Sequence, residues 1–329
     1  MTDPLRVVAA GDDVVPPSLI AHAVGDELRG RPVELRELTP AADAEDELIE
    51  ALAGAEVLIT RGAPVTERLL DACPDLRLVV VCRGGPVDVD LDAAKRRDVR
   101  VCRTPGSEAA ATAEYTLGLM LSALRRIPQA HELLTRRGGG WEDAARHARE
   151  HGGLELEDLP VGVVGHGTVG SRVARVLCAF GAQVMVYDPY ARAEIHGLRV
   201  PRLDDLLARS RVLSLHARLA PGAPGLIGAR ELALLPRGAV VVNTAQGRLL
   251  DEEALCDALE DGQVSAAALD AHAREPLPEA SRLRRLTDRV VLTPHLGGTS
   301  RAVAEKAART AAQEVGRWVR GQPPAHCLT

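Results

Sequence analysis

The stretch Val161–Gly170 reads VGVVGHGTVG and joins a short valine-rich run to a glycine triplet. An apolar helical pattern follows, at Val169, Val173, Val176 and Leu177. This order predicts a strand, a tight turn and the start of a helix. Gly165 permits the turn, Gly167 lets a phosphate approach the backbone, and Gly170 lets the helix pack on the strand. We expect a dinucleotide-binding loop, because free N–H groups and the helix dipole both favour an anion there.

An acidic residue beyond the loop supports this interpretation. A second valine-rich run, residues 183–187, ends directly before Asp188, about 20 residues past the glycines. A carboxylate at this place accepts hydrogen bonds from the ribose hydroxyls and repels a 2′-phosphate, so we expect NAD rather than NADP. Arg192 is close enough in sequence to keep NADP open. The alternative is an ordinary strand–turn–helix with an incidental aspartate.

Composition sets limits on the class of protein. The 329 residues suffice for two domains, and with 46% hydrophobic but only 2% aromatic residues the cores must be built from Ala, Val and Leu. A net charge of −6 argues against nucleic acid or an anionic membrane as the main partner. The partner that we expect is a small-molecule substrate. The six cysteines lack metal-ligand spacing, and the amino-terminal residues do not resemble a signal peptide. We therefore expect a cytoplasmic protein with reduced thiols and no metal.

Short β-like runs alternate with helical patterns along most of the chain, which predicts an α/β protein with parallel sheets. The runs form a first series at residues 7–9, 33–38, 57–59, 78–81 and 99–102, and a second at 161–164, 184–187, 212–215, 239–243, 266–269 and 290–292. Six strands match a full dinucleotide-binding domain. A last helix near 301–320 is expected to pack on the first domain. The expected domains are residues 1–104 with 297–329, and residues 105–296.

Between the two series, the sequence predicts a long helix over 109–126 and then a charged, irregular stretch over 134–155. That stretch is compatible with a surface arm, a lid, a dimer contact or a solvated loop. We take the region near 128–155 as a candidate dimerisation arm.

Hydride transfer at a carbinol carbon needs an acid/base group within hydrogen-bond reach of the oxygen. Histidine titrates in the appropriate range, and a carboxylate partner fixes its orientation. Glu275 and His295 each follow a predicted strand of the second series, at the edge where such sheets bind ligands. The alternative is that His295 caps a turn and Glu275 is a loop charge. The spacing alone leaves both readings open.

Several motifs together resemble the D-isomer-specific 2-hydroxyacid dehydrogenase family over essentially the whole chain. They are the glycine loop with Asp188, the stretch VVNTAQG at 241–247 followed by Asp251-Glu252, Asp270 with Glu275-Pro276, and Thr293-Pro294-His295. The resemblance implies an NAD-binding Rossmann domain inserted into a flavodoxin-like substrate domain, and usually a homodimer. It implies His295 as acid/base and Glu275 as its partner. It also implies contacts with NAD at or beside Gly165, Gly167, Thr168, Val169, Gly170, Asp188, His216, Thr244, Ala245, Asp270, Gly297 and Gly298.

The substrate side departs from the family pattern. Gln246 stands where the family carries an arginine that pairs with the substrate carboxylate. Glutamine brings no charge, and losing one charge-assisted pair costs about 1.5–3 kcal/mol. Glu108 and Asp88 stand where asparagine is usual. Arg83 is either the replacement cation or a surface arginine. The predicted substrate-binding residues are Arg83, Gly84, Gly85 and Glu108, with Gln246 counted among the catalytic residues.

The sequence therefore predicts an NAD-dependent oxidoreductase that transfers a hydride between NAD(H) and a 2-hydroxy or 2-keto acid, or a related non-standard substrate. The alternative is a protein that binds NAD(H) but turns over little or nothing, and serves as a sensor or partner-binding subunit. No residue singles out a different NAD chemistry, such as phosphonate oxidation or a transient oxidation during elimination.

Overall fold

A computed structural model describes residues 3–41, 44–85, 87–136, 140–151, 153–191, 194–220 and 222–329. The chain divides into two compact units. The first unit consists of Met1–Glu108 and Thr299–Thr329, and the second of Ala109–Gly298. The boundaries expected from the sequence, at 104 and 296, fall a few residues before these divisions.

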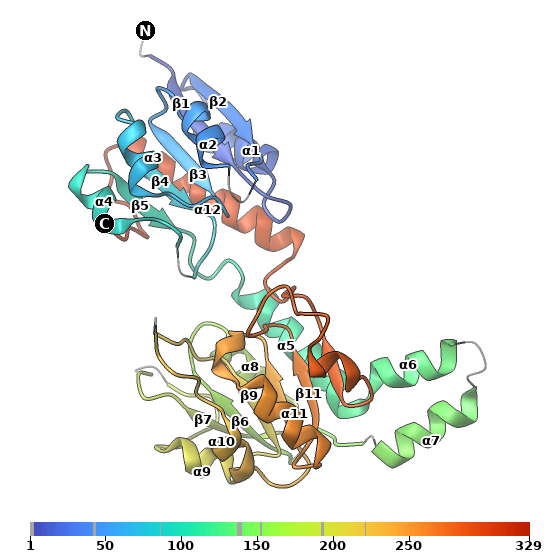
Figure 1. Cartoon of the computed structure of the whole chain (residues 1–329). Helices are drawn as coiled ribbons and strands as arrows, with labels where there is room; N and C mark the ends of the chain where they lie inside the picture. The colour runs from blue at the N-terminus through green and yellow to red at the C-terminus, as the bar shows by residue number, and fades with distance from the viewer. Residues whose placement is uncertain are drawn as a thin grey trace. The chain divides into compact units, whose positions relative to one another are not determined.

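The first unit contains a five-stranded parallel sheet with helices on both faces (Figure 1). The strand order is β2-β1-β3-β4-β5, which is the flavodoxin-like order that we expected. Its strands are β1 (Leu5–Ala10), β2 (Val33–Leu38), β3 (Val57–Thr60), β4 (Leu78–Val81) and β5 (Arg100–Arg103). Its helices are α1 (Pro17–Glu27), α2 (Glu45–Ala51), α3 (Glu67–Ala72), α4 (Leu91–Arg96) and α12 (Arg301–Val319).

Strand β1 shows why both faces of this sheet are covered. Val7 and Ala9 belong to the apolar cluster of α1 and α12, whereas Val8 and Ala10 belong to that of α2, α3 and α4. Successive side chains of a strand point to opposite faces, so an unbroken apolar run needs a helix layer on each side. Helix α12 buries a stripe of alanines against the sheet: Ala304, Ala307, Ala308, Ala311 and Ala312. The last helix therefore packs on the first unit.

The second unit contains a seven-stranded parallel sheet in the order β12-β11-β10-β9-β6-β7-β8. This is the Rossmann order, and the chain changes direction across the sheet between β6 and β9. The strands are β6 (Pro160–Val164), β7 (Gln183–Tyr187), β8 (Leu198–Arg199), β9 (Val212–Leu215), β10 (Ala239–Asn243), β11 (Val264–Leu269) and β12 (Val290–Leu292). The six expected strands are present, and the short edge strand β8 is an addition that the sequence did not indicate.

Helices cover both faces of the second sheet as well. Helices α5 and α8 contribute to one apolar cluster, and α9, α10 and α11 to the other. The helices are α5 (Ala109–Arg125), α6 (Ile127–Thr135), α7 (Trp141–His151), α8 (Gly170–Ala179), α9 (Leu203–Leu207), α10 (Ala229–Leu234) and α11 (Glu252–Glu260), with short 3₁₀ turns η1 (Gly247–Leu249) and η2 (Arg282–Arg285).

The expectation of an irregular stretch over 134–155 is wrong. Helices α6 and α7 pack on each other and extend away from the rest of the second unit (Figure 1). The sequence of α7, WEDAARHAREH, has good helix formers, with Glu142 and Asp143 in its first turn and Arg149 and His151 in its last. Acids at the start and bases at the end complement the helix dipole, so a charged sequence is here also a helical one. Gly138 and Gly139 of the glycine run lie outside the described residues.

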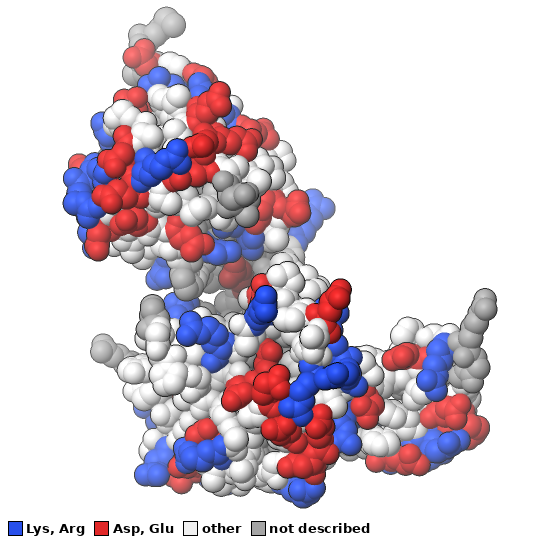
Figure 2. Space-filling view, viewed as in Figure 1, with Lys and Arg blue, Asp and Glu red and all other residues white. Residues whose placement is uncertain are grey.

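The surface carries both signs of charge. Figure 2 shows Lys and Arg interspersed with Asp and Glu over the visible face of each unit. No helix among the described residues is long and apolar enough to cross a membrane.

Candidate active site

The candidate residues of the second unit follow the carboxyl ends of its parallel strands. In chain order they follow β6, β7, β9, β10, β11 and β12: the Gly165–Gly170 loop, Asp188, His216, Thr244–Gln246, Asp270 with Glu275, and His295. These strand ends share one edge of the sheet. Open α/β sheets bind ligands at this edge, beside the point where the strand order reverses.

At two of the three glycines of the loop a side chain would clash with neighbouring backbone atoms, whereas at the third there is open space. Gly165 has a φ of +94°, and a Cβ there would lie 2.6 Å from the carbonyl group of His216. A Cβ on Gly170, where α8 begins, would lie 2.1 Å from the carbonyl oxygen of Gly165. A Cβ on Gly167 would meet nothing within 4 Å. The loop is therefore held tightly at its ends, while the backbone at Gly167 is accessible to a ligand.

Asp188 lies next to this loop at the end of β7. Its carboxylate accepts hydrogen bonds from the backbone N–H of His166 at 2.7 Å and of Tyr190 at 2.8 Å. These bonds fix the carboxylate at the place where a ribose diol is held in dinucleotide-binding folds. Arg192, which kept NADP open at the level of the sequence, lies outside the described residues.

Two histidines beside the glycine loop have a ring nitrogen without a protein partner. Among the described residues, His166 Nε2 and His216 Nδ1 are buried and unpaired, whereas His216 Nε2 lies 2.8 Å from Ser214 Oγ. Burial lowers the pKa of His216 to about 4. Burial, and then the charge of His196, lower the pKa of His166. Neutral imidazoles with an unused nitrogen beside the glycine loop suit a bound ligand, so the residues present fit a dinucleotide.

The turn after β10 is shaped by Asn243. Its Nδ2 donates to the carbonyl oxygen of Gln246 at 2.9 Å, and its Oδ1 accepts from the N–H of Ala245 at 3.1 Å. Thr244 Oγ1 lies 2.6 Å from Thr116 Oγ1. Gln246 Oε1 accepts from the N–H of Leu219 at 3.0 Å. The Gln246 side chain is thus anchored through its oxygen to the loop after β9, and its amide NH₂ is the part that can meet a ligand.

Asp270 holds the loop that carries His295. The Asp270 side chain is buried and accepts hydrogen bonds from Thr293 Oγ1 at 2.6 Å, Leu296 N at 2.8 Å and Gly297 N at 2.7 Å. Its backbone oxygen also accepts from His295 N at 2.9 Å. His295 has a φ of +56°, a conformation that costs a non-glycine residue roughly 1–3 kcal/mol unless its surroundings enforce it. Four hydrogen bonds that Asp270 accepts from this loop supply that enforcement.

Glu275 and His295 face each other as the sequence led us to expect. His295 Nδ1 lies 2.9 Å from Glu275 Oε1 and 3.0 Å from Oε2. Burial acts to raise the pKa of Glu275, but hydrogen bonds from the His272 N–H and from His295 outweigh it, so the pKa of this carboxyl lies below its usual value. The carboxylate is therefore ionised near pH 7. It accepts the Nδ1–H of His295 and leaves Nε2 for another partner.

His272 is a residue that we did not single out from the sequence. It is 7% exposed, its Nε2 lies 3.0 Å from the carbonyl oxygen of Thr293, and its N–H donates to Glu275. Its Nδ1 lies 3.9 Å from Glu252 Oε1. A Cβ on Gly247 would lie 1.9 Å from the His272 carbonyl carbon, so the backbone of η1 packs closely against this segment. The available signal was a histidine three residues past a buried strand, between Asp270 and Glu275.

The substrate-binding candidates of the first unit surround the turn after β4. Gly84 packs against the segment that follows β5, because a Cβ on it would lie 3.1 Å from Gly106 N. The Arg83 guanidinium is half-buried and lies 3.9 Å from the mostly exposed carboxylate of Asp88. Gly85 has open space around its Cα. Glu108 is the last residue of this part of the unit.

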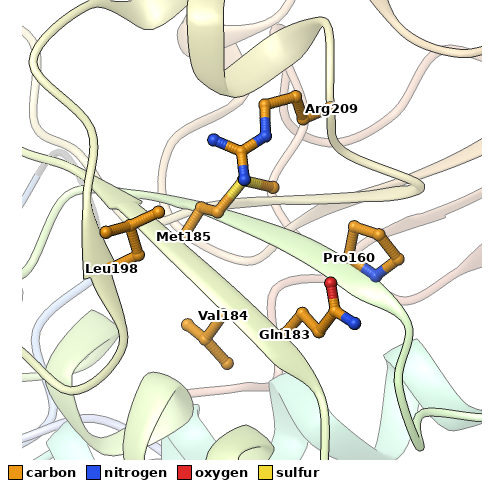
Figure 3. A pocket seen from close by; sticks show the side chains of 6 residues that line it. All are labelled: Pro160, Gln183, Val184, Met185, Leu198 and Arg209. Carbon is orange, nitrogen blue, oxygen red and sulfur yellow. The ribbon is translucent and has the colours of Figure 1, made fainter.

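The second unit also has a cavity of about 280 Å³ away from these residues (Figure 3). Its lining includes Pro160 and Gln183, which are the first residues of β6 and β7, with Arg209 from the segment after α9. The cavity therefore lies toward the amino ends of these strands, opposite the edge that carries Asp188 and His295. Polar groups that could perform acid/base chemistry converge at the other edge, so we do not place the substrate in this cavity.

Comparison with known proteins also assigns an NAD-binding domain to the second unit. Residues 117–297 match the NAD-binding domain of the D-isomer specific 2-hydroxyacid dehydrogenases. The chain belongs to this dehydrogenase family. A D-3-phosphoglycerate dehydrogenase of Mycobacterium tuberculosis is 38% identical over 319 residues, covering 96% of this chain and 57% of that protein. A hydroxypyruvate reductase of Thermotoga maritima is 34% identical over 266 residues, covering 80% of this chain and 85% of that protein.

The folds agree as well. A protein of known structure from Thermus thermophilus aligns with a TM-score of 0.84 and 31% identity, covering 99% of this chain and all of that one. The chain thus has the two-domain architecture of the 2-hydroxyacid dehydrogenases, and its second unit contains their NAD-binding domain. It spans about half the length of the phosphoglycerate dehydrogenases that it matches, 57% in the mycobacterial case.

Proposed function

We propose that the chain catalyses NAD-dependent hydride transfer between a 2-hydroxy acid, or a closely related alcohol, and the corresponding 2-keto compound. The observation that carries this proposal is the pairing of His295 Nδ1 with both carboxylate oxygens of Glu275, at 2.9 and 3.0 Å. An exposed imidazole held by an ionised carboxylate is the arrangement that general acid/base catalysis at a carbinol oxygen requires.

In this mechanism, His295 moves a proton at its Nε2 atom. During reduction, the protonated imidazole donates from Nε2 to the substrate oxygen. During oxidation, the neutral imidazole accepts the hydroxyl proton there. Glu275 holds Nδ1–H throughout and stabilises the imidazolium, and Asp270 keeps His295 in its positive-φ conformation.

NAD supplies or accepts the hydride when it is bound. We assign its pyrophosphate to the glycine loop and the start of α8, and its adenosine ribose to Asp188. The remaining cofactor assignments are Thr168, Val169, His216, Thr244, Ala245, Asp270, Gly297 and Gly298. Thr244 Oγ1 already pairs with Thr116 Oγ1, and the Asp270 carboxylate already accepts from Thr293, Leu296 and Gly297, so we expect these two side chains to shape the site rather than to bind NAD.

The substrate is expected to differ from a simple 2-keto acid. Gln246 offers a neutral amide, anchored through its oxygen by Leu219, where the family pattern has a cation. We propose Arg83 as the residue that pairs with a substrate carboxylate, with the N–H groups at Gly84 and Gly85 supporting it. Glu108 adds negative charge, which favours a substrate with a neutral or cationic group beside its carboxylate.

We further propose a homodimer and a cytoplasmic location. The α6–α7 arm exposes large apolar side chains, with Ile127 at 53%, Leu134 at 48% and Trp141 at 75% exposure. Exposed apolar side chains gathered on one projecting element are typical of an interface with a second copy. Cysteines that are all free are compatible with a reducing compartment.

Steady-state assays with NADH and a panel of 2-keto acids test the function. The panel should include acids with uncharged, anionic and cationic side chains, and each reaction is followed by loss of NADH absorbance. We expect turnover of at least one member, and a fall of 10²-fold or more in kcat/KM for His295→Ala. Gln246→Arg should improve simple keto acids relative to the best substrate by about tenfold or more.

Two results would count against the proposal. The first is a His295→Ala variant that turns over every active substrate as fast as the unmodified chain. The second is tight NADH binding, measured by fluorescence titration, with no turnover of any panel member and no gain from Gln246→Arg. The second result would instead identify an NAD(H)-binding protein without this activity.

A further inference from the structure

The last residues of the chain form an antiparallel partner for β5, at the edge of the first sheet (Figure 1). The N–H of Leu328 donates to Val101 O at 2.7 Å, and the N–H of Arg103 donates to His326 O at 3.1 Å. Cys102 and Cys327 face each other between these two hydrogen bonds. They are therefore a non-hydrogen-bonded pair, the type in which opposite side chains come closest.

This geometry suits a disulfide bond. The Cα atoms of a non-hydrogen-bonded antiparallel pair are about 4.5 Å apart, and both side chains lie on the same face. Disulfides join residues whose Cα atoms are roughly 4.4–6.8 Å apart. Closing the bond thus needs rotation of two side chains and little movement of the backbone.

The two thiols have different surroundings. Cys102 is fully buried, whereas Cys327 is exposed and its Sγ donates to Thr329 O at 2.9 Å. Burial, and then the neighbouring Cys327 and Glu314, raise the pKa of the Cys102 thiol. Glu314 of α12 is itself only 2% exposed, and its Oε2 accepts from Ala325 N at 3.0 Å. A buried carboxylate, a buried thiol and an exposed thiol therefore lie together at this edge.

We propose that Cys102 and Cys327 form a redox site, which closes to a disulfide by exchange with a small disulfide of the oxidised-glutathione class. The exposed Cys327 reacts first. Its thiolate attacks one glutathione sulfur, the glutathione S–S bond breaks, and one glutathione thiolate leaves to give a mixed disulfide. Glu314 then takes the Cys102 proton while Cys102 Sγ attacks Cys327 Sγ. The second glutathione thiolate leaves and takes up that proton.

The sum is two protein thiols and one glutathione disulfide giving one protein disulfide and two glutathione thiols. The bond joins residues far apart in sequence, so it restricts the unfolded chain strongly. It also adds a covalent link between β5 and the segment after α12, which is otherwise held by hydrogen bonds of the backbone, Thr329 and Glu314 and by packing of Leu328. A disulfide of this kind in a reducing compartment is transient and responds to the redox state.

The experiment equilibrates the full chain in buffers of graded reduced and oxidised glutathione, traps free thiols by alkylation, and maps the peptides by mass spectrometry. We expect a Cys102–Cys327 linkage as the dominant disulfide under native conditions. The oxidised chain should melt roughly 5 °C above the reduced chain. Cys327→Ser should abolish both the linkage and the difference in melting temperature. Cys178→Ser removes another exposed thiol and should leave both unchanged.

Glu314→Gln tests the role of the carboxylate. It keeps an oxygen for Ala325 N, so the fold is retained, but it cannot accept a proton. We expect formation of the mixed disulfide at an unchanged rate and closure slowed about tenfold or more. The proposal is overturned if Cys327 stops at the mixed disulfide in the unmodified chain, or if the linkage forms only in denaturant. Closure that is as fast in Glu314→Gln would remove Glu314 from the mechanism.

Discussion

The two halves of the carboxyl edge in the second unit are built differently. Around β6, β7 and β9, shape comes from backbone atoms in close approach, and two imidazole nitrogens have no protein partner among the described residues. Around β10, β11 and β12, shape comes from side chains: Asn243, Asp270 and Glu275 each accept or donate several hydrogen bonds.

This difference indicates two ways of preparing a site. The glycine-loop half leaves space and unused hydrogen-bonding groups, which a ligand can complete. In the half that carries His295, hydrogen bonds within the protein hold the acid/base group, so it is oriented before any ligand arrives; the His272 Nδ1 atom there is the buried atom that lacks a partner among the described residues. Pre-organisation of this kind lowers the cost of reaching the reactive geometry. The two halves should therefore respond differently to mutation.

The largest effect is expected at Gly165. Alanine there combines a φ of +94° with a Cβ 2.6 Å from the His216 carbonyl, so we expect a loss of about 3 kcal/mol or more in the free energy of unfolding. Gly167→Ala is the matched control, because its Cβ meets nothing within 4 Å; we expect a change within about 0.5 kcal/mol but weaker NADH binding. Urea unfolding and NADH titration measure the two quantities. Equal destabilisation by both substitutions would contradict the description of the loop.

Asp270 is the corresponding test of the other half. Asp270→Ala removes the acceptor of three side-chain hydrogen bonds in a buried place, so we expect a loss of about 2–4 kcal/mol in stability. Turnover should fall too, since His295 loses its support. Asp270→Asn keeps the size and one acceptor oxygen and should lose less in urea unfolding. If both variants unfold at the same urea concentration as the unmodified chain, Asp270 does not hold the loop.

Glu275→Gln should lower kcat by about 10²-fold, with NADH affinity unchanged, because the imidazolium loses its counter-charge. The lowered pKa of Glu275 also predicts that the stability difference between the unmodified chain and Glu275→Gln depends on pH. The pKa of Glu275 is lowered in the folded chain, so its contribution to stability is present above the unfolded pKa of about 4.3 and is lost as pH falls through the lower folded value. Melting temperatures of the two proteins should therefore converge in acid. A difference that stays constant from pH 7 to pH 3 would contradict this.

The smallest effect is expected at Asp188. Asp188→Ser keeps an oxygen for the His166 N–H but removes the charge, so NADH binding should weaken about tenfold while NADPH binding strengthens. Fluorescence titration with each cofactor gives both constants. An unchanged ratio of the two affinities would show that Asp188 does not select the cofactor.

Much of the fold could be predicted from the sequence, because the signals were local. Valine-rich runs and the glycine triplet mark strands and one turn, and the residue after each strand is assigned to the ligand edge by the parallel topology alone. The same rule places Glu275 and His295 at that edge, but their pairing was implied by the family resemblance. The family and the NAD-binding domain then followed from several such motifs in one order.

The remaining features depend on partners that are distant in sequence. The residues next to Asp270 in the sequence do not indicate that its carboxylate accepts hydrogen bonds from the N–H groups of Leu296 and Gly297. Nor does the sequence around Gln246 indicate that its side-chain oxygen is held by the N–H of Leu219. The prediction of an irregular stretch over 134–155 was wrong because we took its many charged residues as a sign of a loop. The acids at the start of α7 and the bases at its end favour a helix instead. His272 was passed over because a buried histidine is recognised by its surroundings, not by its neighbours in sequence.

The scarcity of aromatic residues has a practical consequence for spectroscopy. The chain has two tryptophans, and they lie in different units: Trp141 begins α7 and is 75% exposed, whereas Trp318 lies in the last turn of α12 and packs on the apolar core of the first unit. Emission from Trp318 should shift to the red when the first unit melts, while Trp141 should sense association through the arm. With Trp141→Phe and Trp318→Phe, each event acquires its own intrinsic fluorophore, and no external label is needed.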